Sequence, residues 1–355
     1  MKISKVRIEL RDLGYSRPYK IAFKEINKVE ALFVVIQLEN GITGIGSAVP
    51  STFVIKETLK DAIEDFNPKE LDWWTGKDIR SANALIANLS DRIKSITARA
   101  AMDIALHDAF TQNLGISLGT WLGNVKGDMA TSVTIGIKNS EKTLVDAEKF
   151  TQEGFSKLKV KLGSKLSDEI HRIRELRKHF PNHELRLDAN QSFSVEQTGI
   201  LIGELESAQI AFYEQPVPVS EFDDLRSLSK FYRSKIMADE SCIDLKDAIK
   251  LCRADSPCGM INIKLMKSGG IKPGIEIANI AKNAGMPVMW GCNNESSVSV
   301  TAAMHAAYSC SNTKFIDLDG CFDMETDIAN PGFDLNKERL LASSKNGLGL
   351  TEIQM

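Results

Sequence analysis

The sequence lacks the features of a membrane protein and of a disulfide-rich protein. Its apolar run Ala31–Leu38 is far shorter than the ~20 residues that a membrane-spanning helix needs. Met1–Leu10 alternates charged and apolar residues and has no continuous apolar stretch of the kind found in signal peptides. The six cysteines all lie in the last third of the chain and form no C-x-x-C pair, so they do not suggest a disulfide framework. We therefore expect a soluble, cytoplasmic protein with no membrane partner.

A dominant charge is absent as well. The net charge is only −3 over 355 residues, so no global field favours nucleic acid or an anionic membrane as a partner. Hydrophobic residues make up 43% of the chain and charged residues 26%, which are ordinary globular values that argue against disorder, collagen and coiled coil. A chain of this length is expected to form about two domains.

Residues 1–125 suggest a small sheet followed by helices, which would make an α+β domain. Lys2–Leu10 alternates apolar and polar residues, and Val29–Leu38 is rich in Val, Ile and Leu. The glycines at 41, 44 and 46 then indicate tight turns. Their G-x-x-G-x-G spacing differs from G-x-G-x-x-G and no helix signal follows at once, so a dinucleotide site is not expected. Ile96–Phe110 carries apolar residues at helical spacing.

From Met129 onward, short apolar strands alternate with amphipathic helices. From the second strand on, consecutive strand ends lie 25 to 27 residues apart, and eight strands at this interval predict a closed parallel barrel over residues 126–330. An open doubly wound sheet is the alternative, although it usually stops at five or six strands. Residues 331–355 should pack back on the N-terminal domain. The expected strands are Thr131–Ile137, Ser156–Lys161, Glu184–Asp188, Ile210–Glu214, Lys235–Asp239, Met260–Lys264, Pro287–Gly291 and Lys314–Asp317.

Single carboxylates end three adjacent strands of this predicted barrel: Asp188, Glu214 and Asp239. Active sites of such barrels lie at the C-terminal ends of the strands, so these three side chains should converge. They would repel each other unless a cation joined them, and an all-oxygen set suits Mg²⁺. The alternative is that each acid caps the helix that follows its strand.

Lysines occupy the second and sixth strands. Lys159 and Lys161 are two residues apart, so they share one side of their strand, while Leu158 and Val160 face the outer helices. A solvated strand face is the alternative, but a helix-covered barrel has none. Burial lowers the pKa of an ammonium, so a buried lysine could act as a neutral general base. Lys264 ends the sixth strand, diametrically opposite the second.

The acidic pair Asp317 and Asp319 follows the eighth strand, across the barrel from the carboxylates. This layout predicts a substrate with an anionic end at the metal and a cationic end at the acidic pair. A carbon held between Lys161 and Lys264 could lose a proton to one lysine and regain one from the other, which inverts the centre. Mg²⁺ would stabilise the intervening enediolate. The alternative is that the acidic pair merely forms a turn before Gly320.

Taken together, the motifs resemble the enolase superfamily, its muconate-lactonizing subgroup, and within it the dipeptide epimerases. The ordered set is K-V-K (159–161), D-A-N (188–190), E-Q-P (214–216), D-E-S (239–241), I-K (263–264), G-C-N-N-E-S (291–296) and D-L-D (317–319). The match covers nearly the whole chain. The resemblance implies an isomerase with an N-terminal capping domain over residues 1–125, a modified (β/α)7β TIM-like barrel over 126–330, and a C-terminal segment over 331–355.

The resemblance also implies roles for individual residues. Asp188, Glu214 and Asp239 would bind one Mg²⁺ per chain, and Lys161 and Lys264 would be the acid/base pair. Lys159 would hold the substrate carboxylate and keep Lys161 deprotonated, and Asp317 and Asp319 would bind the α-ammonium of a dipeptide. By analogy, the substrate pocket would be lined by Thr134, Ile135, Cys292 and Asn293, with an inert buried thiol as the alternative for Cys292. Relatives commonly self-associate, so a homo-oligomer is expected.

The predicted reaction is epimerisation of the C-terminal residue of a dipeptide. Muconate cycloisomerases, which act on dianions, and N-acylamino acid racemases or o-succinylbenzoate synthases are the alternatives within the subgroup, and a non-catalytic barrel is a third. The mandelate-type branch is disfavoured because Pro287–Glu295 contains no histidine. In the L-Ala-D/L-Glu epimerases of cell-wall peptide metabolism, an arginine near position 24 is expected to meet the Glu side chain. Here Lys24 replaces it, so an Ala-Xaa dipeptide with a small, apolar or polar Xaa is predicted, and Glu remains open.

Overall fold

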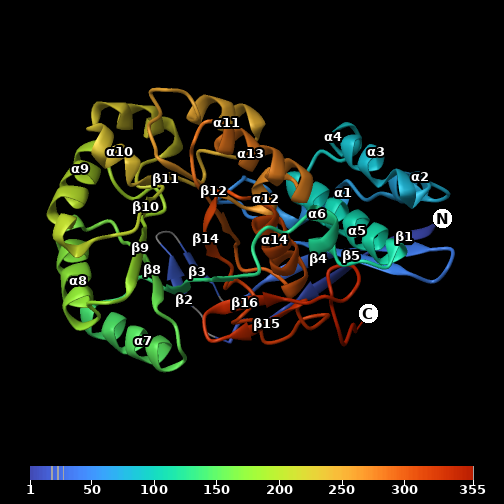
Figure 1. The fold of residues 1–355 in the computed structure, drawn as a ribbon, viewed down its shortest axis with the longest axis horizontal. Coiled ribbons are helices and arrows are strands. Elements are labelled where there is room, and N and C mark those ends of the chain that lie inside the picture. The colour runs from blue at the N-terminus through green and yellow to red at the C-terminus, as the bar shows by residue number, and fades with distance from the viewer. Residues whose placement is uncertain (17–18, 22–23, 27, 355) are drawn as a thin grey trace.

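The computed structural model describes residues 1–16, 19–21, 24–26 and 28–354, and none of the side chains from 17 to 27. Two regions lie side by side in Figure 1: an N-terminal α+β domain that contains the N-terminus, and a β/α barrel. This arrangement confirms the fold class predicted from the sequence.

The N-terminal domain contains a three-stranded antiparallel sheet in the order β1-β4-β5, a β2–β3 hairpin and a set of helices. The sequence located β1 by its alternating pattern and β4 by its Val, Ile and Leu content, each to within two residues, whereas the β2–β3 hairpin was not predicted. The elements are β1 (Ile3–Asp12), β2 (Tyr19–Ile21), β3 (Lys24–Ile26), β4 (Glu30–Leu38), β5 (Thr43–Ala48), α1 (Leu59–Glu64), α2 (Pro68–Trp74), the 3-10 helix η1 (Ile79–Ser81), α3 (Ala82–Ala87), α4 (Leu89–Arg92), α5 (Ile96–Leu114) and α6 (Leu118–Leu122).

Helix α5 is the central helix of this domain. Gly41 forms the expected turn with a positive φ of 85°, but Gly44 and Gly46 lie inside β5, which corrects the prediction of turns there. A Cβ on either glycine would collide with the backbone of α5, so their lack of a side chain lets the helix pack directly on the sheet. Because α5 also contacts α12 and α13 of the barrel, it is buried on nearly every side.

The barrel consists of eight parallel strands in sequence order, β7 to β14, joined by helices. Its strands are β7 (Val133–Ile135), β8 (Lys157–Lys161), β9 (Glu184–Asp188), β10 (Tyr213–Glu214), β11 (Ile236–Ala238), β12 (Met260–Ile263), β13 (Val288–Gly291) and β14 (Thr313–Asp317). Its helices are α7 (Ser140–Gln152), α8 (Leu166–His179), α9 (Val195–Glu204), η2 (Glu206–Ala208), η3 (Val219–Ser227), α10 (Lys230–Ser234), α11 (Leu245–Leu251), α12 (Leu265–Ser268), α13 (Ile271–Asn283) and α14 (Ser297–Ser309).

A parallel bridge between Thr131 and Ile316 joins the two ends of the strand order. The open doubly wound sheet is therefore excluded, and β8 and β12 face each other from positions four strands apart. The interior below the strand ends is filled by an apolar cluster of Phe212, Met237, Met260, Met289 and Phe315. A packed interior leaves the C-terminal strand ends as the place for a site.

The C-terminal segment connects the barrel to the N-terminal domain. Its strands β15 (Phe333–Asn336) and β16 (Arg339–Ala342) form an antiparallel sheet with β6 (Asp128–Ala130). Beyond them, Leu348 donates its backbone N–H to Asp108 of α5 at 2.8 Å. The segment thus contacts both the start of the barrel and the capping domain.

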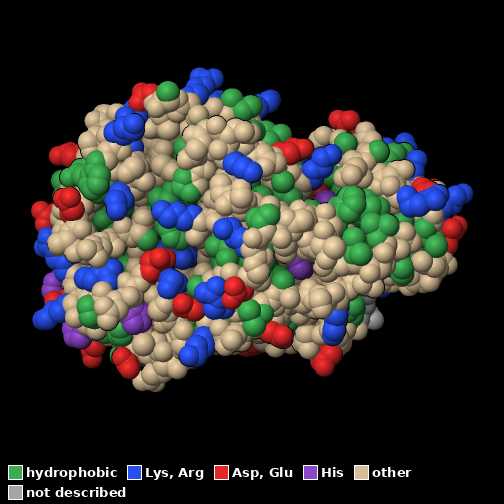
Figure 2. Space-filling view, viewed as in Figure 1, with side chains coloured by type: hydrophobic (Ala, Val, Ile, Leu, Met, Phe, Trp, Pro, Cys, Tyr) green, Lys and Arg blue, Asp and Glu red, His purple; other side chains and the backbone are tan. Residues whose placement is uncertain are grey.

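The mixed charge of the surface and the limited apolar length of the helices agree with the near-neutral charge and the short apolar runs of the sequence. Basic and acidic side chains are intermingled over the face shown in Figure 2, without a continuous region of one sign. In the part of the chain that the structure describes, no helix combines the length and apolar character needed to cross a membrane.

Candidate active site

A cavity of about 480 Å³ lies at the C-terminal ends of the barrel strands and is lined by both domains. The capping domain contributes Tyr15, Glu30 and Phe53 to its wall, and the barrel contributes residues such as Lys161 and Lys264. Most of the predicted site residues therefore meet in one place, although two of them, Thr134 and Asp319, are 185 residues apart in the chain.

Asp188, Glu214 and Asp239 lie under this cavity with at most 1% of each residue exposed. Asp188 and Glu214 pair directly across β9 and β10, which places the two carboxylates at the same depth. Burial, together with the charges of Asp188 and Asp239, raises the pKa of Glu214 to about 8. The other two acids are favoured as anions despite their burial, because Lys161 and Lys159 lower the pKa of Asp188 to about 2 and Lys264 and Lys267 lower that of Asp239 well below its usual range.

The helix-capping alternative for these acids is not supported. Helix α9 is capped by Ser194, and α11 is capped by Asp244. Asp188 instead accepts the backbone N–H of Asn190 at 3.0 Å, and Glu214 accepts the side-chain amide of Asn262 at 2.7 Å. The acids therefore point inward rather than toward the helices.

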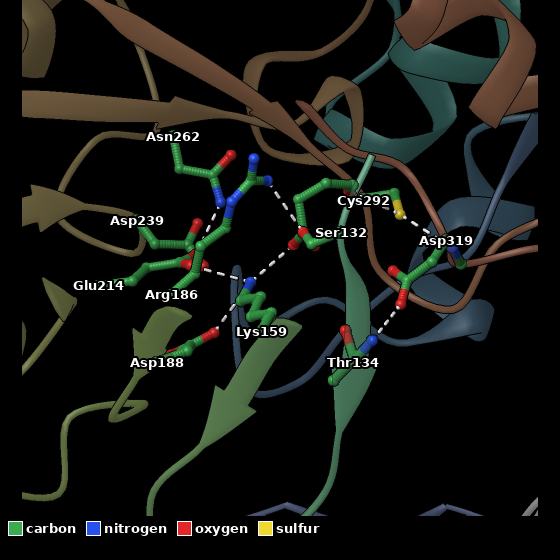
Figure 3. A network of polar contacts seen from close by, with 12 residues as sticks. Ser132, Thr134, Lys159, Arg186, Asp188, Glu214, Asp239, Asn262, Cys292 and Asp319 are labelled. Atoms are coloured by element: carbon green, nitrogen blue, oxygen red, sulfur yellow. Dashed lines mark hydrogen bonds and ion pairs between the residues drawn. The ribbon is translucent and has the colours of Figure 1, made fainter. Parts of the chain in front are cut away.

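Lys159 is the centre of the charged network (Figure 3). It is 2% exposed, whereas Leu158 and Val160 are fully buried against the outer layer, as the alternation predicted. Its Nζ lies 2.7 Å from Asp317 Oδ2, 2.8 Å from Glu214 Oε2 and 3.1 Å from Asp188 Oδ2.

These contacts correct the prediction that burial leaves the lysines neutral. Burial does lower the pKa of Lys159, but the surrounding carboxylates outweigh it and raise the pKa well above its usual range. Burial also lowers the pKa of Lys264, but the charges of Asp239, Glu214 and Glu240 together outweigh it and raise the pKa. Nearby carboxylates stabilise the charged form of each lysine. A bound cation would compete with the lysines for these carboxylates.

Lys161 and Lys264 both line the cavity. Lys161 donates to Asp188 Oδ2 at 2.6 Å, and Lys264 donates to Asp239 Oδ2 at 2.8 Å. Since β8 and β12 are four strands apart, the two ammonium groups approach the cavity from opposite sides, as the sequence predicted.

Sequence reasoning missed Lys267, which lies in α12 and is 1% exposed. Its Nζ is 2.6 Å from Asp239 Oδ1 and also donates to the backbone oxygen of Asn262 at 2.9 Å. The spacing K-x-x-K from Lys264 to Lys267 could have indicated this residue. In the helical turn that follows the strand, residues three apart lie on the same side.

The charge balance of the site favours a divalent cation. Six carboxylates lie at or just after the ends of β9, β10, β11 and β14, and four ammonium groups lie on β8 or shortly after β12. Among the described residues, no three His, Cys, Asp or Glu side chains surround one point closely enough to hold a metal, and Lys159 lies between Asp188 and Glu214. The donors are nonetheless all oxygen, which is the chemistry that Mg²⁺ prefers.

Asp317 and Asp319 line the same cavity. Asp317 lies close to Asp188 and Glu214, since all three are within 3.1 Å of Lys159 Nζ, which corrects the prediction that Asp317 lies across the barrel from these carboxylates. Both Asp317 oxygens have partners, because Ser132 donates to Oδ1 at 2.6 Å and Lys159 to Oδ2 at 2.7 Å. Asp319 accepts the backbone N–H of Thr134 at 2.8 Å. Burial and the nearby Asp317 raise the pKa of Asp319 to about 7. Their side chains thus belong to the site rather than to a simple turn.

The remaining predicted pocket residues divide into three groups. Thr134, Cys292 and Asn293 line the cavity. Ile135 does not line it: strand alternation turns this residue outward, where it is fully buried in the hydrophobic core. The backbone of Lys24 lies in β3, but its side chain falls outside the described part of the structure.

Comparisons with known proteins agree with this geometry. Residues 142–352 match the family model described as enolase C-terminal domain-like, and residues 5–123 match the N-terminal domain of mandelate racemase/muconate lactonizing enzyme. The chain belongs to the enolase superfamily. This assignment confirms the resemblance that the ordered motifs indicated.

Individual relatives of this enolase superfamily member are epimerases. An L-Lys-D/L-Arg epimerase from Methylococcus capsulatus is 40% identical over 352 residues, which cover 99% of each chain. An L-Ala-D/L-Glu epimerase from Clostridium acetobutylicum is 33% identical over 95% of each chain. The crystal structure of the dipeptide epimerase from Methylococcus capsulatus with Mg and the dipeptide L-Arg-D-Lys has a TM-score of 0.97 and 40% identity. It covers 99% of this chain and 100% of that chain.

Proposed function

We propose that this protein is a Mg²⁺-dependent dipeptide epimerase that inverts the α-carbon of the C-terminal residue. The observation that carries the proposal is the placement of Lys161 and Lys264, which reach one cavity from strands four apart. A carbon held between two amines can lose a proton on one face and gain one on the other, which a single base cannot do without moving.

Asp188, Glu214 and Asp239 would hold the Mg²⁺, as the all-oxygen donor set and the excess of carboxylates support. The bound ion would supply positive charge beside the substrate carboxylate, which lowers the cost of removing the weakly acidic α-proton. Binding of the ion would also loosen the hold of these acids on the lysines, so that Lys161 or Lys264 can more easily become a neutral base.

Asp319 is the main proposed partner of the substrate's free α-ammonium. It lines the cavity, and burial together with the charge of Asp317 raises its pKa to about 7, so a cation beside it would stabilise its ionised form. Asp317 would support it from below, since its two oxygens already bind Ser132 and Lys159. This pair favours a free amine over the dianions of cycloisomerases and the neutral amides of acylamino acid racemases.

For the side chains of the substrate, we propose a cationic dipeptide ahead of the Ala-Xaa class that the sequence predicted. The L-Lys-D/L-Arg epimerase is the relative with 40% identity over the full length, and the L-Ala-D/L-Glu epimerase is at 33%. The cavity wall formed by the capping domain includes Glu30, which already binds Lys28 at 2.9 Å. A cationic substrate side chain could compete with Lys28 for this carboxylate, which supports the proposed specificity.

The test is a dipeptide library incubated in D₂O with Mg²⁺, containing Lys- and Arg-dipeptides beside Ala-Xaa and N-acetylated controls. Mass spectrometry should find one deuterium at the C-terminal α-carbon and inversion of that centre, fastest for the cationic members. Chelation of Mg²⁺ should stop both and should also lower the melting temperature, since a bound ion stabilises the folded state. A library without any deuterium uptake would refute the epimerase, and a preference for Ala-Xaa would refute only the cationic specificity.

A further inference from the structure

The turn that carries Lys264 is anchored by the capping domain. Lys264 directly follows β12, and the short helix α12 and Gly270 come next before α13 begins at Ile271. Asp103 of α5, which is fully buried, accepts the backbone N–H of Ile271 on its Oδ1 at 2.6 Å. A carboxylate from the other domain thus holds the far end of the turn.

The two domains touch closely at this point. Gly270 has a φ of 129°, and a Cβ there would lie 2.5 Å from the Cβ of Asp103. Only glycine fits both the backbone conformation and the space. Arg99 and Ile96, which precede Asp103 on the same side of α5, lie near Gly269. The contact therefore extends over two turns of the helix.

Hydrogen bonds inside the turn connect this anchor to Lys264. The backbone oxygen of Lys264 accepts the N–H groups of Lys267 and Ser268, both at 3.0 Å. The hydroxyl of Ser268 lies 3.2 Å from the oxygens of both Lys264 and Gly270. A shift of Ile271 would consequently be transmitted to Lys264 within one short, stiff segment.

His107, one helical turn after Asp103, holds the anchoring carboxylate in place. Its Nδ1 is 3.3 Å from Asp103 Oδ1 and 2.9 Å from the Asp103 backbone oxygen. Both side chains are buried, so the carboxylate has little freedom to leave Ile271.

Lys161 is anchored in a different way. Its backbone oxygen accepts a hydrogen bond from Arg172 Nη2 at 2.6 Å, and Arg172 belongs to α8 of the barrel itself. The backbone of Lys161 is thus held from within the barrel, whereas the turn that follows Lys264 is held from the capping domain.

We propose that Asp103 is a positioning residue for Lys264, through which the capping domain sets the placement of one base of the pair. The proposal rests on the proposed two-lysine reaction. It predicts that loss of Asp103 impairs proton exchange on one epimer of the substrate more than on the other. A residue that merely stabilises the fold would impair both epimers alike.

The experiment compares α-proton exchange in D₂O for each pure epimer before inversion occurs. Lys264→Ala first identifies the epimer that depends on Lys264. In Asp103→Ala, exchange of that epimer should fall by about tenfold or more relative to the other, because small misplacements of a reacting group are costly. Asp103→Asn keeps a neutral acceptor, so it should show the same asymmetry to a smaller extent.

Two variants serve as matched controls. Asp108→Asn alters another buried carboxylate of α5, one that binds Ile45 and Leu348 instead of the turn, and it should affect both epimers equally. Arg172→Lys should give the opposite asymmetry, because Lys lacks the planar fork of Arg. Equal losses for both epimers in both Asp103 variants would overturn the proposal.

Amide hydrogen exchange provides a readout that does not depend on the reaction. Asp103→Ala should show faster exchange at residues 264–271 and unchanged protection elsewhere in the barrel. Unchanged protection of 264–271 would overturn the positioning role even if the activity were lost. If Lys161→Ala and Lys264→Ala each slowed α-proton exchange equally for both epimers, the proposed two-lysine function would be refuted. Amide hydrogen exchange at residues 264–271 would then be the remaining test of the contact between Asp103 and the turn.

Discussion

Lys161 and Lys264 face one cavity from β8 and from the end of β12, and each binds a carboxylate that follows the neighbouring strand. The partners are Asp188 at 2.6 Å and Asp239 at 2.8 Å. The two halves of the site thus repeat one arrangement, an amine with a proposed metal ligand, on opposite sides of the substrate position. This relationship makes the two lysines separately testable.

Replacing either lysine should abolish proton exchange on one epimer only. In Lys161→Ala the remaining Lys264 still reaches its own face of the α-carbon, and the converse holds for Lys264→Ala, while full epimerisation is lost in both. The measurement is deuterium uptake into each pure epimer, followed by mass spectrometry. Lys165→Ala, in an exposed pair with Asp168, is the control and should behave like the unaltered protein. Equal loss for both epimers would contradict the opposed-base arrangement.

Asp319→Asn should weaken the reaction of dipeptides that carry a free amine. Removing a charged partner of an ammonium costs about 1.5–3 kcal/mol, which corresponds to a loss of roughly 10- to 100-fold in kcat/KM, expected mainly in KM. Steady-state kinetics with a free and an N-acetylated dipeptide would check this. If the enzyme turns over the acetylated compound, the substitution should lower its kcat/KM only slightly. A similar loss for both substrates would show that Asp319 does not bind the ammonium.

Lys267→Met should destabilise the fold, because it leaves Asp239 with one buried partner instead of two. Breaking a buried ion pair from one side typically costs about 3–5 kcal/mol, so the urea midpoint should fall markedly. Lys60→Met is the matched control, since Lys60 and Glu64 form an exposed pair and such changes usually stay within about 0.5 kcal/mol. Equal midpoints for the two variants would show that Lys267 has no stabilising role.

The buried histidine His305 should make the free energy of unfolding decrease in acid. Burial in α14 lowers the pKa of His305 to about 4 from its usual 6.5, so the unfolded chain binds the proton more readily than the folded one. The free energy of unfolding should therefore fall as the pH drops from about 6.5 to about 4, and it is fully retained above this window.

The comparison of His305→Gln with the unaltered protein isolates this component. Denaturant titrations at several pH values should give a shallower decline below pH 6.5 for the variant. His171→Gln, which changes an exposed histidine of α8, should keep the original slope. A slope that His305→Gln leaves unchanged would rule out the buried imidazole as its source.

Much of the site could be predicted because the polar residue that ends each short apolar strand can be recognised from the local sequence. Glu184–Asp188 was predicted with the bounds of β9, since a short apolar strand and its terminal acid are both visible in the sequence. Lys159 and Lys161 were placed inside the barrel because side chains alternate along a strand. Ile135 was misplaced, since only the pairing of β7 with β8 shows which residues of that short strand face inward.

The pKa of the lysines could not be predicted in the same way. Burial alone favours a neutral amine, and that was the expectation from the sequence. The structure adds distances, and with Asp317, Glu214 and Asp188 all within 3.1 Å of Lys159 Nζ, attraction outweighs the loss of water. Ion-pair energies depend steeply on separation and burial, neither of which is encoded in residue spacing.

Short-range periodicity and the residue types at strand ends specify the barrel, its strand intervals and most of the acids and lysines of the site, so these could be predicted from the sequence. The tertiary structure alone decided which amine binds which carboxylate, that Lys267 joins the site, and that α5 of the capping domain supports the Lys264 turn through Asp103. These relationships join residues up to 168 positions apart. Contacts of that kind arise from the packing of whole elements against each other, which no local pattern specifies.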